Sequence, residues 1–179
     1  MVNAHTAPLP LDRVRNAAVF EVVGVDFAGR IYLKGGQKAW IRILTCAVYR
    51  AVHLELVNSL SAASFLMALR QDVARRGRPS VIFSDNGEIF VRLSNQLKAL
   101  DYKKIAKTLL IEQIECRLNP PEAPWWGGFW ERLIGVLKRL LRHTLKKSCS
   151  TYEEMLTTLT DCEAVINLRP ITSLPDSHD

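Results

Sequence analysis

The sequence predicts one α/β domain with a five-stranded mixed sheet, in which three antiparallel strands come first and helices flank the sheet. Three observations support this fold class. First, the N-terminal third holds three neighbouring segments rich in β-branched and aromatic residues. Second, a helical segment and a short apolar segment follow them. Third, two long helical segments close the chain. The 179 residues, 48% of them hydrophobic, are enough for one buried core.

The first three strands form an antiparallel set. Residues 19–27 (VFEVVGVDF) have strand composition, and the turn signal Lys34-Gly35-Gly36-Gln37 separates them from a second strand at 39–48. Residues 51–57 (AVHLELV) alternate apolar and polar side chains after a short connection, which indicates a third strand.

The next two elements are a helix and a buried strand. Residues 61–76 have apolar side chains at helical spacing, with Ser61 available as N-cap and Gly77 at the end. Residues 80–83 (SVIF) are typical of a strand buried on both faces, and a turn signal at 84–87 ends it.

The remaining elements carry weaker or longer signals. A helix is expected at 93–100 and a strand at 111–118, followed by an irregular loop up to Gly128. Helices are expected at 129–147 and 151–168, the second opened by a capping box formed by Thr151 and Glu154.

The predicted organisation is an N-terminal linker or arm at 1–18, one core domain at 19–172 and a C-terminal tail at 173–179. No apolar run is long enough to cross a membrane, and the N-terminus lacks the pattern of a secretory signal. No two of the four cysteines have C-x2-C spacing and no two histidines have H-x3-H spacing, so we expect no zinc site and buried free thiols instead.

The positive charge lies in one stretch. The chain has 24 Lys and Arg against 18 Asp and Glu, and the segment 132–147 holds six bases and no acid, so the rest is balanced. These bases are Arg132, Lys138, Arg139, Arg142, Lys146 and Lys147. Such a segment suits a polyanion such as nucleic acid, although a solvated basic helix face is the common alternative.

Three acids occupy unusual places. Asp26 lies in or at the end of a buried strand, Asp85 directly follows another, and Glu131 opens a helix after two glycines. An unpaired carboxylate in a buried strand costs several kcal/mol, so Asp26 needs a partner. Each acid also has a structural alternative: Asp26 pairing with an arginine, Asp85 capping a turn, and Glu131 complementing a helix dipole.

These acids could converge on one rim of the sheet, where carboxylate oxygens suit Mg²⁺ or Mn²⁺. Two ions about 4 Å apart would form a two-metal phosphodiester site. Asn86 is a candidate for a residue that orients the Asp85 side chain without itself binding the metal.

The basic segment 132–147 places positive charge beside Glu131, the third of these acids. At 100° per residue, Glu131, Lys138 and Arg142 fall within about 20° of one another on a helix, with Arg139 and Lys146 beside them. The leucines gather on the other side. The helix can therefore pack against the core and present these bases to a DNA backbone next to the acid.

Four motifs in this order resemble the integrase core of BEL/Pao-type long-terminal-repeat retrotransposons. They are VDFAG at 25–29, PSVIFSDNG at 79–87, NPP at 119–121 running to WGGFWERL at 126–133, and NLRPIT at 167–172. The resemblance implies an RNase H-like fold and a catalytic triad of Asp26, Asp85 and Glu131. It also implies metal-dependent trimming of element DNA ends by water, followed by attack of the freed 3′-hydroxyl on target DNA.

The resemblance carries further expectations about context. It implies retroelement DNA ends and target DNA as partners, self-association, and action in the nucleus after transport in a cytoplasmic particle. The chain would be one piece of a longer polyprotein, since zinc-finger and small basic domains are not recognisable in it. Two alternatives stay open: a catalytically silent, host-adopted DNA-binding or assembly module, and a hydrolase that cleaves without joining.

Overall fold

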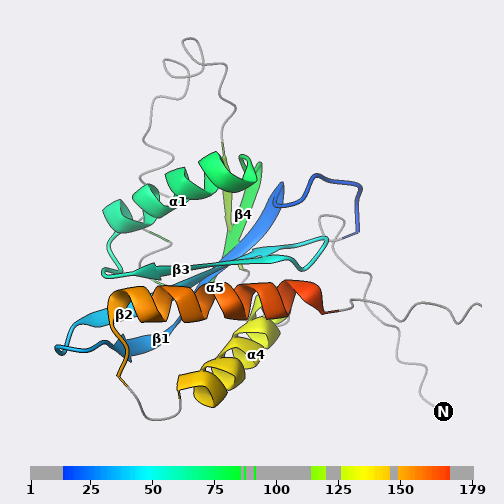
Figure 1. Ribbon diagram of the computed structural model, residues 1–179. Coiled ribbons are helices and arrows are strands. Elements are labelled where there is room, and N and C mark those ends of the chain that lie inside the picture. The colour runs from blue at the N-terminus through cyan, green and yellow to red at the C-terminus, as the bar shows by residue number, and fades with distance from the viewer. Residues whose placement is uncertain are drawn as a thin grey trace, which may run out of the picture.

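The fold is a five-stranded mixed sheet with helices on both faces, as predicted (Figure 1). The computed structural model describes residues 14–85, 87, 91, 114–119, 126–145 and 149–169. The predicted helix at 93–100 lies outside these residues. The described elements are β1 (Val22–Tyr32), β2 (Lys38–Cys46), β3 (Val52–Val57), α1 (Ala62–Arg76), β4 (Val81–Ser84), β5 (Glu115–Leu118), α4 (Gly128–Leu145) and α5 (Tyr152–Leu168).

The strand order across the sheet is β3-β2-β1-β4-β5. β1, β2 and β3 pair antiparallel, and β4 and β5 add parallel strands on the other side of β1. β1 is five residues longer at its C-terminal end than predicted, because a register shift between Ala28 and Ile31 lets pairing resume beyond Gly29. Gly29 has φ 54, which a glycine adopts without strain.

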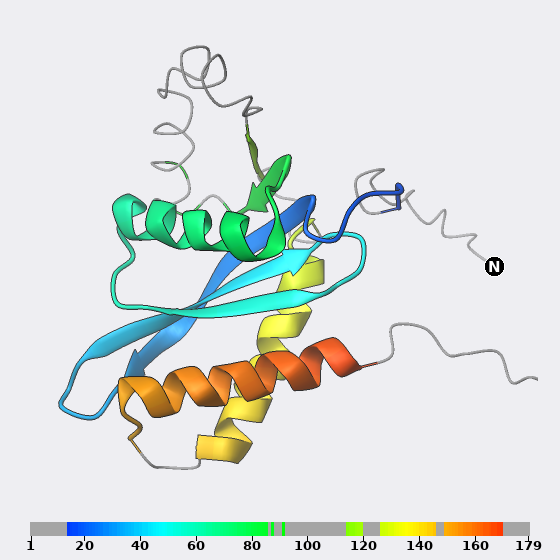
Figure 2. The same cartoon turned by 45° about the horizontal axis from the view of Figure 1, so that its top comes forward.

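Successive side chains of β1 point to opposite faces of the sheet. Val23 and Val25 pack with Phe65 and Leu69 of α1, whereas Ala28 belongs to the cluster that contains the leucines of α4 and α5. Figure 2 shows α1 on one side of the sheet and both C-terminal helices on the other. Any residue two positions from Ala28 along a regular strand therefore faces α4.

The α4 side of the core is built from leucines at helical spacing. Leu133 and Leu137 of α4 are buried together with Met155 and Leu159 of α5. Burying each such side chain stabilises the fold by about 1.5–3 kcal/mol. The predicted apolar face of the helix at 129–147 is thus confirmed for its described part.

The predicted helix starts are also confirmed. Ser61 Oγ accepts a hydrogen bond from the Ser64 amide at 3.2 Å, which satisfies one free N–H at the start of α1. At α5, Thr151 Oγ1 accepts from the Glu154 amide at 3.3 Å and Glu154 Oε2 accepts from the Thr151 amide at 2.8 Å. These two bonds form the capping box expected from the sequence.

A buried ion pair joins β2 to α1. Arg42 and Asp72 are each 1% exposed, and two contacts of 2.6 and 2.7 Å join their charged groups. Glu55 on β3 accepts a further hydrogen bond from Arg42 at 2.5 Å. Two carboxylates thus compensate one buried guanidinium.

The same network continues to α5. His53 Nδ1 lies 3.0 Å from Glu163 Oε2, and Arg76 of α1 donates to Glu163 Oε1 at 2.7 Å. Burial alone would raise the pKa of Glu163, but hydrogen bonds from His53 and the Leu54 amide, with the charges of His53 and Arg76, hold it below its usual range. α1, β3 and α5 are therefore connected by charge as well as by apolar packing.

The cysteine prediction holds in part. Cys46 and Cys162 are buried free thiols, Cys116 is partly exposed, and Cys149 is exposed because it lies in the connection before α5. Among the described helices, none is long and apolar enough to span a membrane.

Candidate active site

Asp26 lies on β1, and Asp85 directly follows the neighbouring strand β4. β1 and β4 run parallel, and Val25 pairs with Ser84 at the end of their register. Asp26 is the next residue of β1 and Asp85 is the first residue after β4, and paired strands lie about 4.8 Å apart. The strand pairing therefore brings together two acids that are far apart in the sequence.

Asp26 is placed on the α4 side of the sheet, and Asp85 lies just beyond β4. Val25 faces α1, so Asp26, the next residue, points to the other face. On β4, Phe83 packs in a cluster with Phe129 and Trp130, and Asp85 is two positions further along the chain. Asp85 Oδ1 accepts a hydrogen bond from the Gly87 amide at 2.9 Å, so the turn cap considered for this acid is present in the structure.

Glu131 is held near β1 by the close docking of α4. A Cβ on Gly24 would lie 2.7 Å from Phe129 Cζ and would also collide with the ring of Trp130, so only glycine permits this approach. Trp130 is 1% exposed. The residue before Glu131 is therefore fixed against β1, two positions from Asp26.

The start of α4 also constrains the Glu131 side chain. The amides of Trp130 and Glu131 both donate to the carbonyl oxygen of Gly127 at 3.0 Å. A Cβ on Gly127 would lie 2.6 Å from Glu131 Oε1, so the carboxylate folds back over this glycine. Glu131 itself is exposed.

The charges of the other two acids act on Asp26. Burial, together with the charges of Asp85 and Glu131, raises the pKa of Asp26 to about 6 against the lowering effect of the Phe27 amide. Lys138 acts in the opposite direction. The predicted triad and one predicted DNA-contact residue therefore share one electrostatic environment.

The donor set fits a hard divalent cation. In the part of the chain that the structure describes, no three His, Cys, Asp or Glu side chains are gathered tightly enough to enclose a metal. Mg²⁺ does not require such a cage, because it keeps several waters and binds through one or two carboxylates plus substrate phosphates. Asp26, with two further carboxylates and one lysine whose charges reach it, suits an open site of that kind.

The predicted basic residues lie on the outer face of α4. Lys138, Arg139 and Arg142 are exposed, on the side of the helix away from the buried leucines. Lys146 and Asn86 lie outside the described residues. The basic surface thus begins beside the acids and continues along the helix.

The described aromatic residues before Arg132 serve packing. Phe129 and Trp130 are buried, and the Trp126 ring lies 5.9 Å from that of Phe83. Sequence reasoning missed the part played by Gly24. The signal was present, because an isolated glycine inside a strand pattern often marks a close approach of another element.

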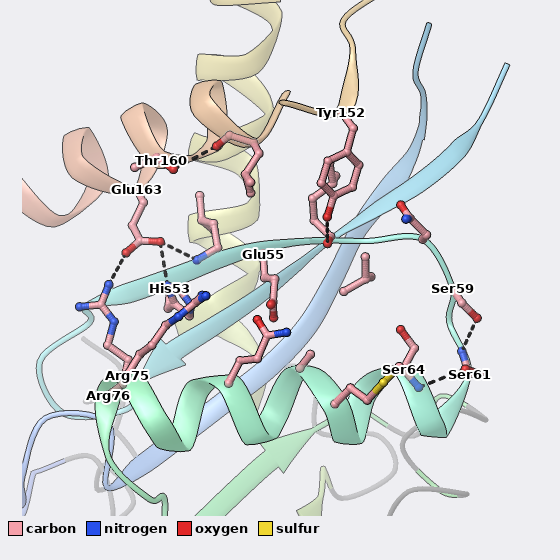
Figure 3. Close-up of a pocket in the computed structure, with 18 of the residues that line it drawn as sticks. His53, Glu55, Ser59, Ser61, Ser64, Arg75, Arg76, Tyr152, Thr160 and Glu163 are labelled. Atoms are coloured by element: carbon pink, nitrogen blue, oxygen red, sulfur yellow. Dashed lines mark hydrogen bonds and ion pairs between the residues drawn. The ribbon is translucent and has the colours of Figure 1, made fainter. Parts of the chain in front are cut away.

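A cavity of about 800 Å³ lies elsewhere, between β3, α1 and α5 (Figure 3). His53, Arg76, Tyr152 and Glu163 line it, and none of the three acids does. β3 is the edge strand farthest from β4. This cavity is therefore separate from the candidate active site.

The fold is the RNase H-like fold found in retroviral integrase catalytic cores. The core domain of HTLV-2 integrase, solved with magnesium, superposes with a TM-score of 0.60 at 16% identity, covering 89% of this chain and 94% of that one. The core domain of BIV integrase gives 0.57 at 18% identity, covering 86% and 88%.

A longer chain of similar structure belongs to the simian T-cell lymphotropic virus intasome, solved in complex with PP2A regulatory subunit B56 gamma. It has a TM-score of 0.65 and 18% identity over 97% of this chain, which spans 58% of that chain. No protein-family model and no curated protein matches the sequence. At these identities the comparisons establish the fold.

Proposed function

We propose that the chain is the catalytic core of an integrase, a polynucleotidyl transferase that trims retroelement DNA ends and joins their 3′-hydroxyls to target DNA. One observation carries this proposal most directly. Asp26 lies on a strand, Asp85 directly follows a second strand and Glu131 lies on a helix, and the charges of the latter two reach the first. The likeness of the fold to integrase cores supports a shared site for these three acids.

Each acid has a role that its position supports. Asp26 on β1 and Asp85 just after the parallel strand β4 would hold Mg²⁺ or Mn²⁺ ions, and Glu131 would complete the set from α4. Two such ions supply an activated attacking oxygen and a stabilised leaving oxygen in phosphodiester chemistry. Lys138 and Arg142, exposed on α4, would position the DNA backbone beside the acids.

The finer context of the proposal comes from the motifs and the structural relatives. The four sequence motifs support a BEL/Pao-type retroelement as the source, with element ends and target DNA as partners. Relatives in structure include a dimeric and a trimeric integrase core and an intasome, which supports a homo-oligomer. Integration would place the protein in the nucleus.

A joining assay with a labelled 3′-hydroxyl donor and a plasmid target tests the activity in Mn²⁺ or Mg²⁺. Asp85→Asn is expected to abolish joined product while thermal unfolding shows that the variant is folded. Asp161→Asn, which removes an exposed carboxylate on α5, is the matched control and is expected to join normally.

The same assay separates the alternatives. Cleaved donor without joined product from the parent protein would point to a hydrolase. DNA binding with neither product would point to a catalytically silent binding module. Full joining by Asp85→Asn would overturn the triad.

A further inference from the structure

Three arginines gather away from the basic face of α4. Arg50 lies in the turn between β2 and β3, Arg132 near the start of α4, and Arg169 at the C-terminal end of α5. Figures 1 and 2 both show this turn, the start of α4 and the end of α5 at the same end of the molecule. Neither Arg50 nor Arg169 belongs to the acidic triad or to the basic face of α4.

Arg50 is held in place by packing. Its φ is 58, and its guanidinium carbon lies 5.0 Å from the centroid of the Phe129 ring. Arg50 Nη1 is buried, and among the described residues it has no hydrogen-bond acceptor. A buried donor without an acceptor is costly, so this geometry favours an acceptor from outside the described chain.

Arg169 is ordered beside it. Arg169 Nη2 donates to the carbonyl oxygen of Arg50 at 3.1 Å, and Nη1 donates to that of Ile166 at 2.5 Å. Asn167 accepts from the Val52 amide at 2.8 Å and donates to the Val52 carbonyl oxygen at 2.9 Å. These bonds fix the end of α5 to β3 and hold the two guanidinium groups near each other.

The local charge is positive. Burial lowers the pKa of Arg50 against the raising effect of Cys46, and the positive charges of Arg132 and Arg169 lower it further. In the described ranges no carboxylate acts on Arg50. Three like charges at one place favour an anionic ligand.

The size of the site limits the ligand. A pocket of about 50 Å³ is lined by Tyr49, Arg50, Ala51, Ile166, Asn167 and Arg169. One water takes about 30 Å³ of liquid volume, so the pocket has room for one or two oxygen atoms and none for a base. A phosphate oxygen meets both the size and the charge.

We propose that Arg50, Arg132 and Arg169 form a second phosphate-binding site, which holds one backbone phosphate of duplex DNA. This inference rests on the proposed function for the identity of the ligand as DNA. Arg132 directly follows Glu131, so the site lies within one helical turn of the acids. A phosphate bound there fixes the position of the duplex relative to the acids, and the arginines act as positioning residues.

Fluorescence anisotropy with a labelled DNA duplex, in EDTA and over a series of salt concentrations, tests the site. Arg132→Gln is expected to weaken binding and to reduce the slope of log K against log salt by about 0.9, the value for one lost phosphate contact. Arg50→Gln, which removes the guanidinium group and keeps a polar side chain, is expected to do the same. Arg70→Gln removes an exposed charge from α1 and is expected to change neither quantity.

The outcomes are distinct from those of the joining assay, because binding is measured without divalent ions. Folded Arg50→Gln and Arg132→Gln proteins that match Arg70→Gln in affinity and slope would overturn the phosphate site and leave the triad untouched. Since Arg132 is exposed, its substitution tests the site even if Arg50→Gln fails to fold. Reduced slopes together with an active Asp85→Asn enzyme would instead support the site and refute the proposed catalytic acids.

Discussion

At the scale of single residues, Asp26 shows how a functional carboxylate can oppose stability. Burial, with the charges of Asp85 and Glu131, raises its pKa to about 6, above the ordinary value of 3.8. The folded state therefore binds a proton more tightly than the unfolded state. Stability is fully present below about pH 4 and is lost as the pH rises through about 6.

This gives a prediction for Asp26→Asn. The substitution removes the buried charge, so the free energy of unfolding at pH 7.5 without metal is expected to rise by up to about 2 kcal/mol. The loss of stability between pH 4 and 7 is expected to become shallower. Urea unfolding across this pH range checks both effects.

Asp161→Asn is the control for that experiment, because it removes an exposed carboxylate. It is expected to leave the pH profile unchanged. An Asp26→Asn protein that is less stable than the parent at pH 7.5 would contradict the account of Asp26 as a destabilising group without its cation.

At the scale of elements, the docking of α4 on β1 positions Glu131. Gly24 permits the contact with Phe129 and Trp130, since any Cβ there would overlap both rings. Gly24→Ala is expected to cost about 1–3 kcal/mol of stability through overpacking and to reduce joining activity by displacing Glu131. Thermal unfolding and the joining assay measure the two effects.

Gly135 offers a matched control on the same helix. It is exposed, and a Cβ there would meet nothing within 4 Å. Gly135→Ala is expected to add about 0.5–1 kcal/mol of stability through helix propensity, with joining activity retained. Equal behaviour of the two variants would show that Gly24 has no special role in docking.

The same elements show how far the sequence could predict the structure. Strand alternation, the Ser61 cap and the Thr151–Glu154 capping box are local signals, and each was predicted. The extension of β1 to Tyr32 was not, because Gly29 and the register shift interrupt the local pattern and only pairing with β2 restores it. Local patterns identify elements, but partner strands set their ends.

The candidate site also combines features that local patterns predict with features that depend on the packed fold. The three acids stood out in the sequence as charges in unusual places, and the order of the strands then brought two of them together. The pairing of Arg42 with Asp72 and the grouping of Arg50 with Arg169 could not be predicted. Contacts between residues 30 and 119 positions apart depend on packing that no local pattern encodes.

At the scale of the whole molecule, the buried ionic network connects the edge of the sheet to helices on both faces. Asp72→Ala would leave Arg42 buried with less compensation and is expected to cost about 3–5 kcal/mol. Replacing both residues, as in Arg42→Met with Asp72→Leu, is expected to cost much less, because no buried charge is then left unpaired. Urea unfolding of both variants checks this.

A double variant at least as destabilised as Asp72→Ala would contradict this account, because apolar packing would not have compensated for the lost pair. The network lies toward β3 and α5, on the far side of β1 from Asp85. Its loss is therefore expected to lower stability more than it alters chemistry in the fraction that remains folded.

The central claim is that Asp26, Asp85 and Glu131 form one divalent-metal site. Anomalous diffraction from a crystal soaked in Mn²⁺ tests it most directly, since it locates the ion without requiring activity. The account predicts a peak between the carboxylates of Asp26 and Asp85, lost in an Asp85→Asn crystal. Full Mn²⁺ occupancy elsewhere, with no peak between these two aspartates, would contradict it.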